Sequence, residues 1–185
     1  MVEGESEETY FNRIARLTDA YSFRVKISRD KRPLDMIDNC FTESSRIGLD
    51  DDDLRIAVFD LDVVSPEELE RSVRAAREKH VEIMSSNLSF EVWLLMHLCN
   101  VTRAYTQDDY EEILSGHIGH RYRKSEGLKE RITLGTIRDA IERGRGALAI
   151  PDPMICKDTP NSTTLWKLLS DILDGGSNTE HGNHQ

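Results

Sequence analysis

The stretch from Leu54 to Asp62 constrains this chain more than any other. It reads Leu-Arg-Ile-Ala-Val-Phe-Asp-Leu-Asp, a short apolar run that ends in two aspartates one residue apart. Such a run is typical of a buried parallel strand. Because side chains alternate along a strand, Asp60 and Asp62 share a face if the backbone stays extended through Leu61. Two carboxylates held together repel each other unless a cation neutralises them, so the stretch predicts a metal site.

The segments around this strand alternate between strand and helix patterns. Strand patterns cover residues 23–27 and 81–84, a helix capped by Ser6 precedes the first of them, and Ser65 caps a helix before the second. This alternation predicts an α/β fold with a mostly parallel sheet flanked by helices. We expect an α/β part with the acidic site over residues 1–100, a helical part packed on it over residues 101–174, and a disordered tail over residues 175–185.

Several polar residues follow strands or begin helices at the same predicted sheet edge. Parallel strands end at a common edge, which brings Glu3, Asp60 and Asn87 together. The acidic run at residues 3–8 is either part of a metal site or an ordinary helix start, and the pattern alone favours the helix start. Glu91 lies at the start of a later helix, where it either touches a cation or complements the helix dipole.

Charge and cysteine content limit the classes of partner and compartment. The net charge of −10 disfavours a generic phosphate-backbone binder, so nucleic acid would be reached through a bound cation or the basic residues 121–124. The odd cysteine count, without paired metal spacing or a secretion signal, indicates reduced thiols. No apolar run reaches the length of a membrane span. We therefore expect a cytoplasmic protein without membrane contact.

A series of motifs, in order along the chain, resembles the RloB family. The most specific is Phe-Glu-x-Trp-Leu-Leu-x-His at residues 90–97, whereas a lone Asp-x-Asp is common among proteins. The matching segments are residues 3–7, 10–11, 59–62, 86–87, 90–97, 122, 124 and 160–164.

The catalytic half of the RloB family resembles a Toprim domain. The resemblance therefore implies a Toprim-like fold and a Mg²⁺- or Mn²⁺-dependent nuclease or phosphodiesterase, associated with phage defence through abortive infection or restriction-modification loci. In Toprim domains a glutamate after the first strand and an Asp-x-Asp after a later strand position the metal. Carried onto this chain, the implied metal ligands are Glu3, Asp60 and Asp62, the further catalytic positions are Glu7 and Glu91, and the substrate contacts are Asn87 and Lys124.

Three functional hypotheses remain open at this point. The first is the metal-dependent hydrolase, with a nucleic acid or nucleotide held through the metal and an ATPase or restriction-system subunit as partner. The second is a non-catalytic nucleotide- or protein-binding subunit of a defence complex, which is favoured by the short first strand, since only Met1 and Val2 precede Glu3. The third is a structural α/β domain whose acidic pair caps the following helix.

Overall fold

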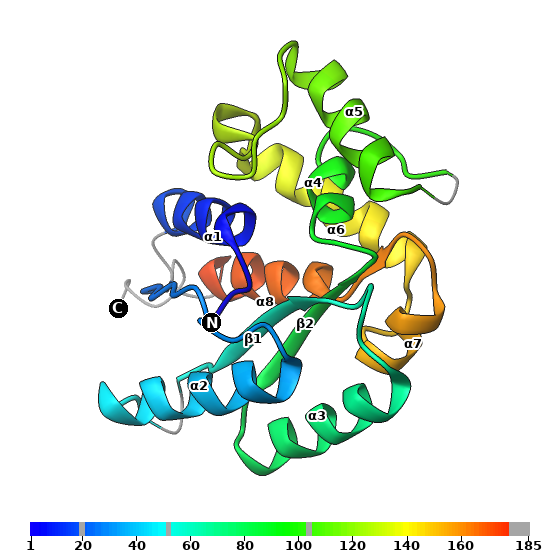
Figure 1. Cartoon of the computed structure of the whole chain (residues 1–185). Helices are drawn as coiled ribbons and strands as arrows, with labels where there is room; N and C mark the ends of the chain where they lie inside the picture. Colours follow the sequence, from blue (N-terminus) through cyan, green and yellow to red (C-terminus); the bar gives the residue numbers. More distant parts are fainter. Residues whose placement is uncertain (19–20, 51–52, 103–104, 178–185) are drawn as a thin grey trace, which may run out of the picture.

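The computed structural model describes residues 1–18, 21–50, 53–102 and 105–177. In this part of the chain, a small sheet lies between two groups of helices (Figure 1). The strands are β1 (Ile56–Asp60), β2 (Glu82–Asn87) and β3 (Ser162–Thr163). The helices are α1 (Glu5–Leu17), α2 (Pro33–Arg46), α3 (Pro66–Glu78), α4 (Glu91–Met96), α5 (Gln107–Ile118), α6 (Leu134–Ala147), α7 (Pro153–Asp158) and α8 (Leu165–Ser177), with a 3₁₀ turn at Lys129–Arg131.

The sheet has the order β1-β2-β3 and is mixed. β1 and β2 are parallel, with a register that runs from Ile56 opposite Glu82 to Asp60 opposite Ser86, whereas β3 is antiparallel to β2. The prediction of a mostly parallel sheet is therefore wrong. The reason is the position of α7: it packs at the carboxyl end of β2, where the Asn87 amide donates hydrogen bonds to its carbonyls, so the short connection enters β3 from that end.

The prediction of a strand at residues 23–27 is wrong except at Ile27, the last of these residues. Val2 forms parallel bridges to Ile27 on one side and to Val58 on the other, and residues 21–26 form no further ladder. Among the described residues, Val2 is the residue that bridges to this segment, so the pairing there amounts to a single bridge.

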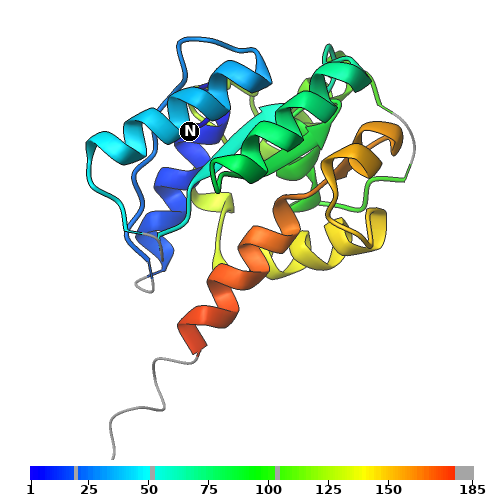
Figure 2. The ribbon, with the colours of Figure 1, turned by 90° about the horizontal axis from the view of Figure 1, so that it is seen from below.

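The alternation of side chains along β1 divides the core into two layers. Ala57 and Phe59 pack with α2, α3 and α7, whereas Val58 and the β2 residue Met84 pack with α1, α4, α5, α6 and α8. Figures 1 and 2 show these two groups of helices on opposite faces of the sheet. Asp60 is two residues from Val58 and therefore lies on the α1 face.

The helix starts follow local rules in most places. Ser65 accepts a hydrogen bond from the Glu68 N–H at 3.2 Å, which confirms the predicted cap of α3.

The last helix, α8, extends to Ser177, and residues 178–185 of the predicted tail lie outside the described residues. Among the described helices, none is both long enough and apolar enough to cross a membrane.

Candidate functional site

Acidic side chains meet at the carboxyl end of β1. The Val2 bridge to Val58 places the next residue, Glu3, beside the end of the strand, and its Oε2 accepts a hydrogen bond from the Asp60 backbone N–H at 3.0 Å. α1 begins two residues later, so Glu7 in its first turn faces the same region. We refer to Glu3, Glu7, Asp60 and Glu91 as the acidic cluster, since the charges of the other three raise the pKa of Asp60.

Burial and mutual repulsion shift the protonation of this cluster. Glu7 is 4% exposed, and burial, followed by the charges of Glu3 and Glu91, raises its pKa to about 7. The pKa of Asp60 is raised well above its ordinary value by desolvation first, and then by the charges of Glu7, Glu3, Glu91 and Asp62. The folded protein therefore disfavours full ionisation of the cluster in the absence of a cation.

Asp62 lies beyond the end of β1, on an exposed loop. Its Oδ1 accepts a hydrogen bond from the Val63 N–H at 2.8 Å. The Lys157 ammonium donates hydrogen bonds to the carbonyls of Leu61 and Asp62, which ties this loop to α7. The structure thus places Asp62 near the acidic cluster, but on a more solvated segment than Asp60.

Glu91 is 1% exposed and is held by a network of donors rather than by one partner. Its Oε1 accepts hydrogen bonds from Ser6 Oγ at 3.2 Å and from Tyr122 OH at 3.3 Å, and its Oε2 accepts one from Gln107 Nε2 at 3.3 Å. Burial alone would raise the pKa of Glu91, but the charge of Lys124 and the hydrogen bonds hold it below its ordinary value. These contacts favour the ionised form of Glu91.

The position of Ser6 in the sequence predicted that it caps α1, and this prediction is wrong. The cap residue is Gly4, which makes no side-chain hydrogen bond, and Ser6 lies inside the helix with its hydroxyl toward Glu91 and 3.0 Å from Tyr122 OH. The hydroxyl of Ser6 donates to the buried Glu91 carboxylate instead of capping the helix. A buried carboxylate without donors costs more free energy than uncapped N–H groups at a helix end that water can reach.

Lys124 connects the Glu91 network to the rest of the cluster. Its ammonium lies 3.6 Å from Glu91 Oε1, and half of its side chain is exposed. Burial alone would lower the pKa of Lys124, but the charges of Glu91, Asp60 and Glu7 raise it. The ammonium therefore stays charged beside the cluster, in a position from which it can also reach an anion in solvent.

Asn87 has a different environment. Its Nδ2 donates hydrogen bonds to the carbonyls of Cys156, Lys157 and Thr159 at 2.8–3.2 Å. These contacts join the end of β2 to the segment that leads into β3. In the structure this side-chain nitrogen supports the sheet edge, and no contact brings it to the acidic cluster within the described residues.

Sequence reasoning missed Gln107 and gave Ser6 and Tyr122 no role in the site. Both Ser6 and Tyr122 fall in segments that resemble the RloB family, so that resemblance was the available signal. Gln107 follows the Thr106 cap of α5 and has an ordinary helical sequence around it, so nothing local marks it.

The resemblance to Toprim domains implies a divalent cation, and the donors can be tested against it. Glu3, Glu7 and Asp60 offer carboxylate oxygens, which Mg²⁺ prefers, and Mg²⁺ needs only a few of them because it keeps several waters. Burial first, and then the neighbouring negative charges, raise the pKa of Glu7 and of Asp60, and a bound cation would offset the repulsion between these charges. Among the described residues, no three Asp, Glu, His or Cys side chains are already arranged around one point. The donor set therefore fits the ion by its chemistry, although the side chains are not arranged around one point in this structure.

Comparison with known proteins adds one finding. No curated protein and no solved structure matches the chain. A protein-family model described as "RloB-like protein" matches residues 1–172, which include every candidate site residue. The chain therefore belongs to the RloB-like protein family.

Proposed function

We propose that this RloB-like protein is a Mg²⁺- or Mn²⁺-dependent phosphodiester hydrolase, a nuclease or nucleotide phosphodiesterase that acts in phage defence. The observation that supports the chemistry is the convergence of Glu3, Glu7 and Asp60, from two segments far apart in the chain, at the carboxyl end of β1. The defence role, in abortive infection or beside a restriction-modification system, rests on the family resemblance alone.

In this proposal each acidic residue has a distinct task. Glu3, Asp60 and Asp62 hold the cation, and the Asp60 N–H already orients the Glu3 carboxylate. Glu7, with a pKa of about 7, is the candidate general base because it can accept a proton near neutral pH. A bound divalent ion supplies polarisation of the phosphate and stabilisation of the leaving oxygen.

In this proposal, Glu91 and Lys124 form the part of the site that contacts the substrate. Glu91 is already saturated by donors, so its task is to hold Lys124 beside the cluster rather than to ligate the ion. The Lys124 ammonium then contacts a phosphate oxygen of the substrate. Because the chain carries a net charge of −10, the Lys124 ammonium and the metal ion have to supply most of the attraction for a polyanionic substrate.

The proposal is tested by comparing cleavage by three proteins. Wild type, Asp60→Asn and Asp38→Asn are incubated with RNA, DNA and nucleotide substrates in Mg²⁺, Mn²⁺ or EDTA. Asp38 is half-exposed, lies on α2 across the sheet and pairs with Lys79, so its variant controls for loss of one carboxylate. We expect metal-dependent cleavage by wild type and Asp38→Asn, and a loss of about a hundredfold or more in Asp60→Asn. Equal cleavage by all three proteins would refute this site.

The second candidate function is a non-catalytic subunit that binds a nucleotide or a protein through the same acidic cluster. It is favoured by the finding that no three ligands in the described residues already surround one point. Metal binding by calorimetry in wild type, lost in Asp60→Asn and accompanied by no cleavage of any substrate, would support this function over the enzyme.

A further inference from the structure

The loop between β1 and α3 carries Asp62, one of the three proposed metal ligands. Both ends of this loop are anchored. The Leu61 N–H donates a hydrogen bond to the Ser86 carbonyl of β2 at 3.0 Å, and the side chains of Leu61 and Val64 are buried in the core. Between these anchors, Asp62 and Val63 are exposed. The position of the Asp62 carboxylate therefore depends on the contacts that hold the backbone of this short exposed stretch.

The Lys157 side chain of α7 supplies such a contact. Its ammonium donates a hydrogen bond to the Leu61 carbonyl and a longer one, of 3.5 Å, to the Asp62 carbonyl. The hydrogen bond from the Val63 N–H to Asp62 Oδ1 lies within the loop and does not attach it to another element. In the described part of the chain, Lys157 is therefore the side chain whose hydrogen bonds join the Asp62 backbone to a separate helix.

α7 is itself fixed to the sheet. The Asn87 amide at the end of β2 donates hydrogen bonds of 2.8–3.2 Å to three carbonyl oxygens within residues 156–159. The Cys156 side chain of α7 is fully buried beside β2, and its thiol contacts the Ser85 carbonyl. Because β2 pairs with β1, the Lys157 side chain extends from a helix that is attached to the same sheet as the acidic cluster.

We propose that Lys157 is a positioning residue for Asp62: its ammonium fixes the loop backbone so that the Asp62 carboxylate reaches a divalent cation together with Glu3 and Asp60. This inference rests on the proposed function, since it requires the cation site. It also gives Asn87 a role that differs from the substrate contact implied by the family resemblance. Asn87 holds the end of α7, and α7 holds Lys157.

The sign of the change in metal affinity separates positioning from charge. The Lys157 ammonium is a positive charge near the proposed cation site, so by charge alone its removal tightens the binding of a divalent cation. Loss of the loop anchor has the opposite effect, because a ligand that is no longer held has to be ordered when the cation binds. Weaker binding without the ammonium therefore indicates positioning.

The first measurement is Mn²⁺ binding by calorimetry to the full chain, as wild type and as Lys157→Met. Methionine keeps most of the apolar stem and removes the ammonium, and the half-buried position accommodates it. We expect the Kd for Mn²⁺ to rise about tenfold in Lys157→Met, the lower end of the effect of contacts that orient metal ligands.

The second measurement needs no metal. Backbone order parameters from ¹⁵N relaxation in EDTA report the motion of Asp62 and Val63 directly. We expect values of about 0.85 in wild type and below about 0.6 in Lys157→Met, which separate rigid from flexible backbone.

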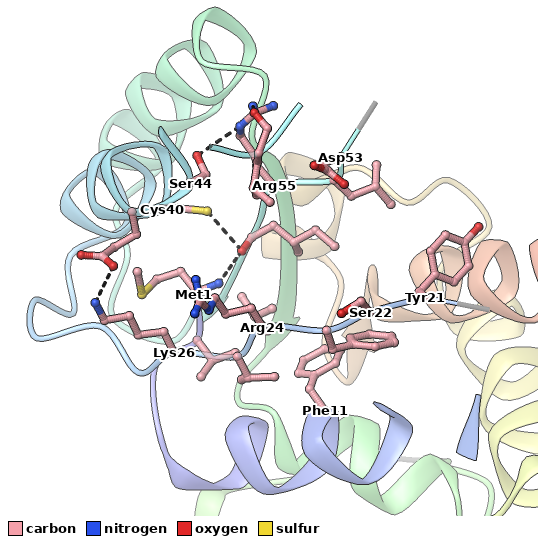
Figure 3. A pocket seen from close by; sticks show the side chains of 18 of the residues that line it. Met1, Phe11, Tyr21, Ser22, Arg24, Lys26, Cys40, Ser44, Asp53 and Arg55 are labelled. Atoms are coloured by element: carbon pink, nitrogen blue, oxygen red, sulfur yellow. Dashed lines mark hydrogen bonds and ion pairs between the residues drawn. The ribbon is translucent and has the colours of Figure 1, made fainter. Parts of the chain in front are cut away.

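Lys26→Met is the matched control for both measurements. Lys26 lies towards the other end of β1, where its ammonium pairs with Glu43 at 2.7 Å beside a cavity of about 370 Å³ (Figure 3). This variant removes the same charge and the same donors without a contact to the loop that carries Asp62. We expect the Mn²⁺ affinity and the order parameters of wild type.

Equal or tighter Mn²⁺ binding by Lys157→Met would overturn the positioning role, and so would unchanged order parameters at Asp62 and Val63. An equal loss of affinity in Lys157→Met and Lys26→Met would also overturn it, because the effect would not depend on the contact with the loop. Failure of the proposed function gives a different result. In that case wild type binds no Mn²⁺, and the metal-related role of Lys157 fails with the function.

Discussion

Replacement of Glu7 by glutamine is expected to stabilise the metal-free protein at alkaline pH. The Glu7 pKa is 4.5 in the unfolded reference and about 7 in the folded protein. Because the folded value is higher, the folded state keeps a proton that the unfolded state has lost, and stability falls as pH rises from 4.5 through 7. The difference between about 7 and 4.5, at about 1.4 kcal/mol for each pH unit, gives about 3 kcal/mol. Glutamine has the same size and no charge to desolvate.

The assay is urea unfolding of wild type, Glu7→Gln and Glu5→Gln at pH 5 to 8 in EDTA. We expect Glu7→Gln to exceed wild type by about 1 kcal/mol at pH 5 and by up to about 3 kcal/mol at pH 8, and the value at pH 8 corresponds to a Tm higher by about 6–12 °C. Glu5 is exposed in the same first turn of α1, so Glu5→Gln controls for the helix dipole. His97, whose pKa burial lowers to about 3, titrates identically in all three proteins and cancels in the difference.

Parallel stability curves for wild type and Glu7→Gln over this pH range would refute the reasoning. They would mean that the Glu7 carboxylate is solvated in the folded protein and that the acidic cluster stores no electrostatic repulsion. If the cluster binds a cation, millimolar Mg²⁺ is expected to raise the free energy of unfolding of wild type. The difference in this free energy between wild type and Glu7→Gln then becomes smaller, because the ion offsets the same repulsion that the glutamine removes.

Two further predictions concern packing and the buried hydrogen-bond network. Gly144→Ala is expected to destabilise by about 1 kcal/mol, because a Cβ there would lie 2.9 Å from the Trp166 Cβ and overpacking outweighs the gain in helix propensity. Gly146→Ala, with nothing within 4 Å of the new Cβ, is its control, and equal urea midpoints for the two variants would contradict the packing argument. Tyr122→Phe is expected to cost about 1–2 kcal/mol in the same assay, since Glu91 loses a buried donor, and an unchanged midpoint would show that the other donors suffice.

Local sequence patterns determined the elements that depend on neighbours along the chain. The apolar run before Asp60 predicted β1, and β1 ends at that residue. Ser65 followed by proline predicted the start of α3, and the motifs at residues 90–97 and elsewhere identified the family that the matched model confirms. These features are encoded by side-chain period, capping and motif spacing, all of which are read over a few residues.

Only the tertiary structure decided which polar groups meet and which strands pair. Ser6 looked like a helix cap, but it contacts Glu91 and Tyr122, which lie 85 and 116 residues away. The direction of β3 follows from the packing of α7, and of the predicted strand at residues 23–27 only Ile27 forms a bridge, to Val2, within the described residues. Such outcomes depend on partners that folding brings together over long separations, and a pattern read along one segment does not contain the identity of the partner.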